Sequence, residues 1–220
     1  MGWPECPMLG LMTDKDERNL VKERFDLLEK QIYQGLRGGW PVRDAAVELA
    51  CLLLDWRPDP EVCELVERSP GELTDERVAE LAGRLIANFE PGFDLAPERW
   101  ETLVQALGTV ERDLRATGPE PAADVQLVQP EWAQEWDTAY VSYNGTTHGS
   151  GIPSFEGTDP ETALQVVADA LQEVVMEFTW TVWPLCPVHH TGLHASLDAG
   201  KPAVWRCHPC GGPVAAIGEL

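Results

Sequence analysis

Three cysteines and four histidines lie within residues 186–210, and their spacing is typical of a metal site. Cys186 is followed by two residues and then His189; after 17 more residues, Cys207 is followed by two residues and then Cys210. Zinc takes four sulfur or nitrogen ligands in a tetrahedron, and two close pairs about 15–20 residues apart can supply them as two facing turns. The pattern predicts zinc bound by Cys186, His189, Cys207 and Cys210.

The identity of the histidine ligand stays open at this stage. His190 is the next candidate after His189, followed by His194 or His208. A closed set of four protein ligands makes a zinc site structural, because a catalytic site keeps one coordination position for water. We therefore expect a structural zinc ion and no catalytic residues.

A glycine-rich loop around His148 is the second stretch with catalytic residue types. Residues 145–151 hold His148 and Ser150, which could supply a general base and a nucleophile. Ser150 is not part of a Gly-x-Ser-x-Gly elbow, and the sequence places no third partner beside it. We expect a surface loop between two strands, with a metal-dependent hydrolase as an alternative to a non-enzymatic protein.

The chain between the two metal pairs must run out and back for the pairs to meet. Residues 193–197 and 202–206 are predicted strands, and Asp198–Gly200 is the turn between them. Residues 214–217 are a third predicted strand. This arrangement resembles a zinc ribbon over residues 184–218.

The elements before this segment are two strands and a helix. Residues 125–128 and 138–143 are rich in β-forming residues. Thr158 and Glu161 have the spacing of a capping box, which predicts a helix with Glu161 and Gln172 on its outer face. Its predicted inner face consists of Leu164, Val167, Ala168, Leu171, Val174, Val175 and Phe178.

The first half of the chain has apolar residues at helical spacing between turn residues, and residues 42–56 are apolar on most sides. We predict an α+β protein in which an all-α bundle of four to five helices (13–117) is joined by a linker (118–123) to a small acidic α+β domain (124–220).

The charge of the chain narrows the choice of partner. It carries 37 acidic and 16 basic residues, a net charge of −21, and residues 119–220 hold 13 acids and only two bases, Lys201 and Arg206. Nucleic acids and anionic membranes attract clustered lysine and arginine, so we expect neither as a partner. We expect a protein partner instead, and a basic one would be attracted by this charge. No apolar run is long enough for a membrane span and no basic signal region precedes one, so we expect a cytoplasmic protein.

Residues 183–194, 204–207 and 213–218 resemble the C-terminal segment of small actinobacterial proteins that share a WPxCPxHxxGLH segment and have no established activity. In those proteins the second turn often holds one cysteine, so Cys210 is a departure from their pattern. The resemblance extends to the helical half, notably residues 90–118, and suggests an immunity or antitoxin role. Such a protein would neutralise a basic toxin through its acidic surface. The main expectation is a non-enzymatic, zinc-stabilised protein-interaction protein.

Overall fold

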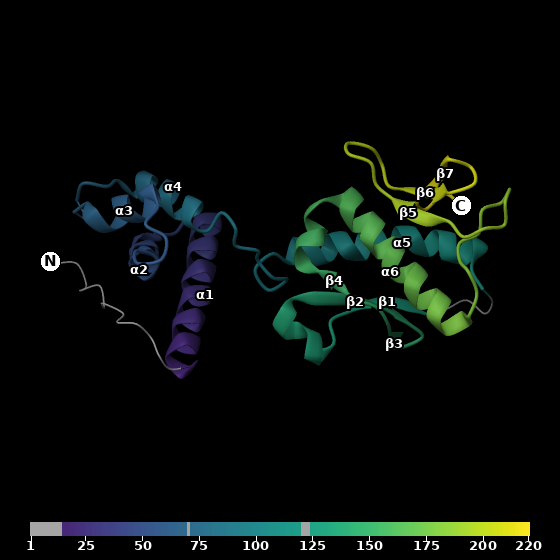
Figure 1. The fold of residues 1–220 in the computed structure, drawn as a ribbon, viewed down its shortest axis with the longest axis horizontal. Coiled ribbons are helices and arrows are strands. Elements are labelled where there is room, and N and C mark those ends of the chain that lie inside the picture. The colour runs from purple at the N-terminus through teal and green to yellow at the C-terminus, as the bar shows by residue number, and fades with distance from the viewer. Residues whose placement is uncertain (1–14, 70, 120–123) are drawn as a thin grey trace. The chain divides into compact units, whose positions relative to one another are not determined.

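The computed structural model describes residues 15–69, 71–119 and 124–220, which form two compact units, 15–91 and 92–220 (Figure 1). Thr13, where the helical domain was predicted to begin, and residues 120–123 of the predicted linker lie outside the described residues. The fold is α+β, as predicted: both units contain helices, and the second also contains two small antiparallel sheets.

The first unit is built from α1 (Lys15–Gly38), α2 (Arg43–Leu53), α3 (Pro60–Glu67) and α4 (Asp75–Leu85). α2 contacts each of the other three helices, which agrees with its apolar character on most sides. Ala46, Leu49 and Ala50 of α2 are fully buried, and they share one core with apolar residues of α1, α3 and α4.

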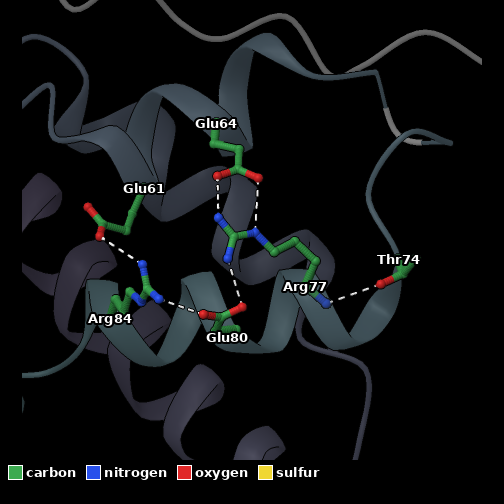
Figure 2. Close-up of polar contacts among 6 residues, drawn as sticks. All are labelled: Glu61, Glu64, Thr74, Arg77, Glu80 and Arg84. Carbon is green, nitrogen blue, oxygen red and sulfur yellow. Dashed lines mark hydrogen bonds and ion pairs between the residues drawn. The ribbon is translucent and has the colours of Figure 1, made fainter.

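Ion pairs on the surface of the first unit join α3 to α4 (Figure 2). Arg77 donates two hydrogen bonds to Glu64, of 3.0 and 2.6 Å, and one of 2.7 Å to Glu80. Arg84 pairs with Glu80 and with Glu61. The side chain of Thr74 caps α4 by accepting a hydrogen bond from the Arg77 N–H.

The second unit is built around α5 (Pro97–Thr117) and α6 (Pro160–Thr179), which pack against each other. The first sheet contains β1 (Val125–Val128), β2 (Thr138–Tyr143), β3 (Thr146–Thr147) and β4 (Ile152–Pro153), and β2 pairs with the other three strands. Two short 3-10 helices, η1 (Glu131–Trp136) and η2 (Ser154–Thr158), flank β2 and β4. β2 is buried along its whole length and packs on α6.

The second sheet contains β5 (His194–Ser196), β6 (Val204–Cys207) and β7 (Gly212–Ala216), in that order and all antiparallel. These strands overlap the three that were predicted from the sequence. β5 packs on α6, whereas β1 of the first sheet packs on α5, so the helix pair lies between the two sheets (Figure 1).

The place of α5 differs from the expectation that residues 97–117 form part of an N-terminal bundle. Its apolar residues Leu103, Leu107 and Val110 belong to the same core as those of α6 and both sheets. An amphipathic stripe shows that one face of a helix is buried but not which element buries it.

α6 also departs from the sequence expectation in two details. Its N-cap is Asp159, not Thr158, and the Asp159 carboxylate accepts a 2.9 Å hydrogen bond from the Thr162 N–H. The predicted inner face is buried or partly buried except at Phe178, which is 42% exposed and stacks on Tyr143.

Candidate metal centre

Two short turns at one end of the second sheet carry the predicted ligands. Cys186 and His189 lie between α6 and β5, Cys207 is the last residue of β6, and Cys210 lies in the connection from β6 to β7. In each turn the residue after the second ligand is left-handed: His190 has a φ of 55° and Gly211 a φ of 68°. Because this conformation reverses the chain within a few residues, it allows both members of each pair to point the same way.

Backbone hydrogen bonds hold the first turn in place. The Cys186 N–H donates to the Thr191 carbonyl at 2.8 Å, and the Leu193 N–H donates to the Pro184 carbonyl at 2.8 Å. The His190 N–H closes the turn by donating to the Cys186 carbonyl at 2.9 Å. The turn is therefore a small hairpin that leads directly into β5.

The four predicted ligand atoms converge, with all of them within 4.8 Å of one another. The sulfurs of Cys186 and Cys210 are 3.8 Å apart. His189 Nδ1 lies 3.7 Å from the sulfur of Cys186, 3.6 Å from that of Cys207 and 3.2 Å from that of Cys210. Such a group can bind a metal ion, and it includes His189 rather than the other three candidate histidines.

One side of the centre is buried and the other faces solvent. Cys186 and Cys207 are fully buried, whereas His189 and Cys210 are exposed. The Thr191 hydroxyl lies 3.7 Å from the Cys207 sulfur, close enough for an O–H···S hydrogen bond. An outer hydrogen bond of this kind orients a thiolate and stabilises its charge.

The thiols of this centre do not ionise alike. Burial disfavours the charged form of Cys186, but hydrogen bonds from the backbone N–H groups of His189 and Val188 outweigh it and lower the pKa of the thiol to about 6. Cys210 is exposed as a whole, but partial desolvation of its sulfur and its contacts with the sulfurs of Cys207 and Cys186 together raise the pKa of its thiol to about 11. A cation bound between the sulfurs would favour the thiolate form of every cysteine in the centre, because a coordinated thiol loses its proton.

Trp205, which precedes Cys207 by two residues in β6, and Asp113 of α5 are both almost wholly buried. The Asp113 carboxylate accepts hydrogen bonds from Trp205 Nε1 (2.7 Å), from the Gly218 N–H (2.6 Å) and from the Leu220 N–H (2.8 Å). It therefore ties β6 and the end of the chain to α5. The sequence pattern gave no signal for this role, because a lone aspartate on a helix usually faces solvent.

Two polar residues of α6 also hold the segment that carries this sheet. Gln172 donates from its amide to the carbonyls of Trp183 (2.8 Å) and Leu193 (2.6 Å). The Glu161 carboxylate accepts a 2.6 Å hydrogen bond from the Ala203 N–H. Both residues were expected on the outer face of the helix, and both instead support the metal-binding segment.

The remaining candidate histidines do not take part in the centre. His190 is the left-handed turn residue, His194 begins β5 and His208 is an exposed residue between Cys207 and Cys210. His148 lines a separate cavity of about 220 Å³ with Ser150, Asp169 and Glu173, among others.

In that cavity, burial raises the pKa of the Asp169 carboxyl. His148 Nε2 lies 4.0 Å from a carboxylate oxygen of Glu177.

No protein-family model matches the sequence, and no curated protein or solved structure is similar enough to count as a relative. Among the described residues, no helix combines the length and the apolar character needed to cross a membrane. The interpretation of the centre therefore rests on its own geometry.

Proposed function

We propose that the centre holds one structural zinc ion, and that the protein is a non-enzymatic, protein-binding protein whose C-terminal segment is a zinc ribbon. The observation that carries the proposal is the convergence of three thiols and one imidazole from two turns that are 17 residues apart in the sequence. Three sulfurs and one nitrogen are a common ligand set for structural zinc.

The distances support this choice of metal. Zinc–sulfur bonds of about 2.3 Å and zinc–nitrogen bonds of about 2.0–2.1 Å, arranged in a tetrahedron, put two sulfurs about 3.8 Å apart and sulfur and nitrogen about 3.5 Å apart. The sulfurs of Cys186 and Cys210 are 3.8 Å apart, and two of the three sulfur–nitrogen distances are 3.6 and 3.7 Å. The third sulfur–nitrogen distance, between Cys210 and His189, is 3.2 Å, so these two ligand atoms would move slightly apart around a zinc ion.

A zinc ion at this site would act as a structural cross-link. Four protein ligands complete its coordination, which leaves no position for a water molecule or a substrate. Cys186 and His189 would be joined to Cys207 and Cys210 across the sheet, and the free energy of metal binding would add to the stability of the folded segment.

The charge distribution favours a protein partner with a basic surface. An immunity or antitoxin protein that neutralises a basic toxin would have such a partner. The only two bases in residues 119–220 are Lys201 and Arg206, and both pair with the carboxylate of Asp198. Residues 119–220 hold 13 acids against these two bases, so this half of the chain carries a large net negative charge. Such a charge speeds association with a basic protein, and salt weakens the effect.

The proposal is tested by amide hydrogen exchange before and after a chelator is added. We expect chelation to expose the amides of β5, β6 and β7 and to leave those of α1–α4 unchanged, and Cys207→Ser to reproduce this pattern. Cys63→Ser removes a thiol of α3 outside the centre and serves as the control. Unchanged exchange in β5–β7 after chelation would contradict a structural metal, and a hydrolytic activity lost in His148→Ala would contradict the non-enzymatic role.

A further inference from the structure

The segment that leads from α6 to the metal centre exposes a run of large apolar side chains. Trp180 is 90% exposed, Val182 50%, Leu185 48% and Val188 71%. These four residues, which we call the apolar ridge, lie within nine positions of the sequence. Scattered apolar residues are normal on a protein surface, but a concentration of this kind marks an interaction site.

Trp180 is unfavourable for the isolated protein in two ways. It ends α6 in the left-handed conformation, with a φ of 55°, and its N–H donates to the Met176 carbonyl. Helices usually place glycine at such a position, because a side chain there meets the backbone. Trp180 also leaves a large indole in water. Neither feature helps folding, so a role in binding explains the residue better.

The structure holds the base of the ridge firmly. Between Val182 and Leu185, Trp183 is only 2% exposed, packs edge-on against Trp205 and donates from Nε1 to the Thr117 hydroxyl at 3.1 Å. Leu185 forms a bridge with Gly192. The exposed side chains therefore project from a fixed backbone, which lowers the entropy lost on binding.

The ridge is also continuous with the metal centre. Leu185 directly precedes Cys186, and Val188 lies between Cys186 and His189 in the first turn. A metal ion bound by Cys186 and His189 would fix the backbone on which Leu185 and Val188 are carried. Metal binding and partner binding should therefore be coupled.

We propose that the apolar ridge is the docking surface for a basic protein partner, with Trp180 as its anchor, and that the bound metal keeps it in shape. This inference rests on the proposed function and adds to it the surface and the anchor. The occupant follows from charge. Glu173 and Glu177 are exposed on the last turns of α6, and both bases of residues 119–220 are paired with Asp198. A second copy, with its own net charge of −21, and an anionic membrane would both be repelled.

The probe is a fluorescent amphipathic peptide made only of lysine and leucine, with a glutamate–leucine peptide as its counterpart. We expect the full-length, metal-loaded protein to bind the lysine peptide and not the glutamate peptide. Trp180→Gly should weaken binding at least about tenfold, as expected for a central aromatic anchor, without lowering the melting temperature. Trp136→Gly removes another exposed tryptophan of the same unit and should change binding less than about twofold. A chelator should weaken binding of the wild type.

Several outcomes would overturn the docking surface. Absence of binding to the lysine peptide, or equally strong binding to the glutamate peptide, would contradict a basic partner. Equal binding by Trp180→Gly and Trp136→Gly would contradict the anchor role of Trp180. Trp180-dependent binding to phosphatidylcholine vesicles in place of the peptide would indicate a membrane surface, and Trp180-dependent self-association in sedimentation would indicate a second copy of the chain. The metal content of each sample is measured alongside. If the protein holds metal and Trp180→Gly has no effect, the ridge proposal fails and the metal centre stands. If the protein holds no metal, the structural zinc fails, and the two tryptophan variants still decide the ridge.

Discussion

The two units of this protein use polar side chains differently. In residues 15–91, arginines pair with glutamates on the surface, as Arg77 does with Glu64 and Glu80 (Figure 2). Residues 92–220 have surface pairs too, but polar groups also hold their interior together: Asp113 accepts three hydrogen bonds, and four metal-ligand atoms, two of them from buried cysteines, converge at one end of the second sheet. Surface ion pairs contribute little to the free energy of unfolding and are screened by salt, whereas removal of a buried acceptor or a metal ligand lowers that free energy strongly. The stability of the second unit should therefore depend strongly on a few polar residues, whereas no single surface pair should be essential to the stability of the first.

The largest expected effect is the loss of one metal ligand. His189→Ala removes the only nitrogen donor of the group and should reduce metal affinity by orders of magnitude, since the site is left with three ligands. His190→Gly should keep the metal, because glycine readily adopts the left-handed conformation that His190 holds. Competition with a colorimetric chelator measures both variants. Metal loss in His190→Gly and retention in His189→Ala would reverse the assignment of the ligand.

Acid should separate the two units. Metal ligands must be deprotonated, so protonation of the ligands should release the metal in mildly acidic solution. In the first unit, hydrogen bonds from Arg77 hold the pKa of the Glu64 and Glu80 carboxyls below their ordinary value of 4.5. Carboxyls with depressed pKa values stabilise the fold above that value, and the contribution is lost as pH falls through the folded-state pKa. Circular dichroism with metal release followed in parallel should show the second unit changing first. Loss of α1–α4 before metal release would contradict this order.

Removal of the buried carboxylate should destabilise the second unit by several kcal/mol. Asp113→Ala leaves Trp205 Nε1–H and the N–H groups of Gly218 and Leu220 without their acceptor. One buried and two partly buried donors left unsatisfied correspond to about 3–5 kcal/mol. Urea unfolding of the metal-loaded protein measures the loss. Glu101→Ala removes an exposed carboxylate from the same helix and should be nearly neutral; equal effects of the two variants would show that Asp113 is not a structural anchor.

The smallest effect should follow from Arg77→Ala in the first unit. Arg77 bridges α3 and α4, but its side chain and that of Glu64 are about a third exposed, at 34% and 28%. Exposed pairs contribute little, and salt reduces the contribution further. We expect a small fall in melting temperature that shrinks as sodium chloride is added. A fall as large as that of Asp113→Ala would remove the contrast between the units.

The metal ligands could be predicted from the sequence because their geometry is local. A Cys-x2-His or Cys-x2-Cys pair fits within one turn. The residues between the two pairs form two β-forming runs separated by turn residues, which predicts a hairpin that brings the pairs together. Spacing also favoured His189 over His190, and the ligand atoms of the structure agree. The β5–β7 strands were predictable for the same reason, since turn residues separate short β-forming runs.

What could not be predicted depends on contacts between distant segments. The apolar stripe of α5 predicts a buried face, but only the folded chain shows that α6 and the sheets cover it. Glu161 fits a capping box by spacing, yet its carboxylate reaches the Ala203 N–H and Asp159 caps the helix instead. Asp113 has no sequence signal at all, because its three donors come from residues more than 90 positions away.

The most direct test of the metal centre is the metal content of protein purified without a metal-affinity tag, measured by mass spectrometry. One zinc ion per chain in the wild type and in Cys63→Ser, and none in Cys207→Ser, is the expected result. Freshly reduced wild-type protein that holds no metal, and keeps β5–β7 protected from hydrogen exchange, would contradict a zinc-stabilised sheet. The three thiols and His189 would then be ordinary packing residues.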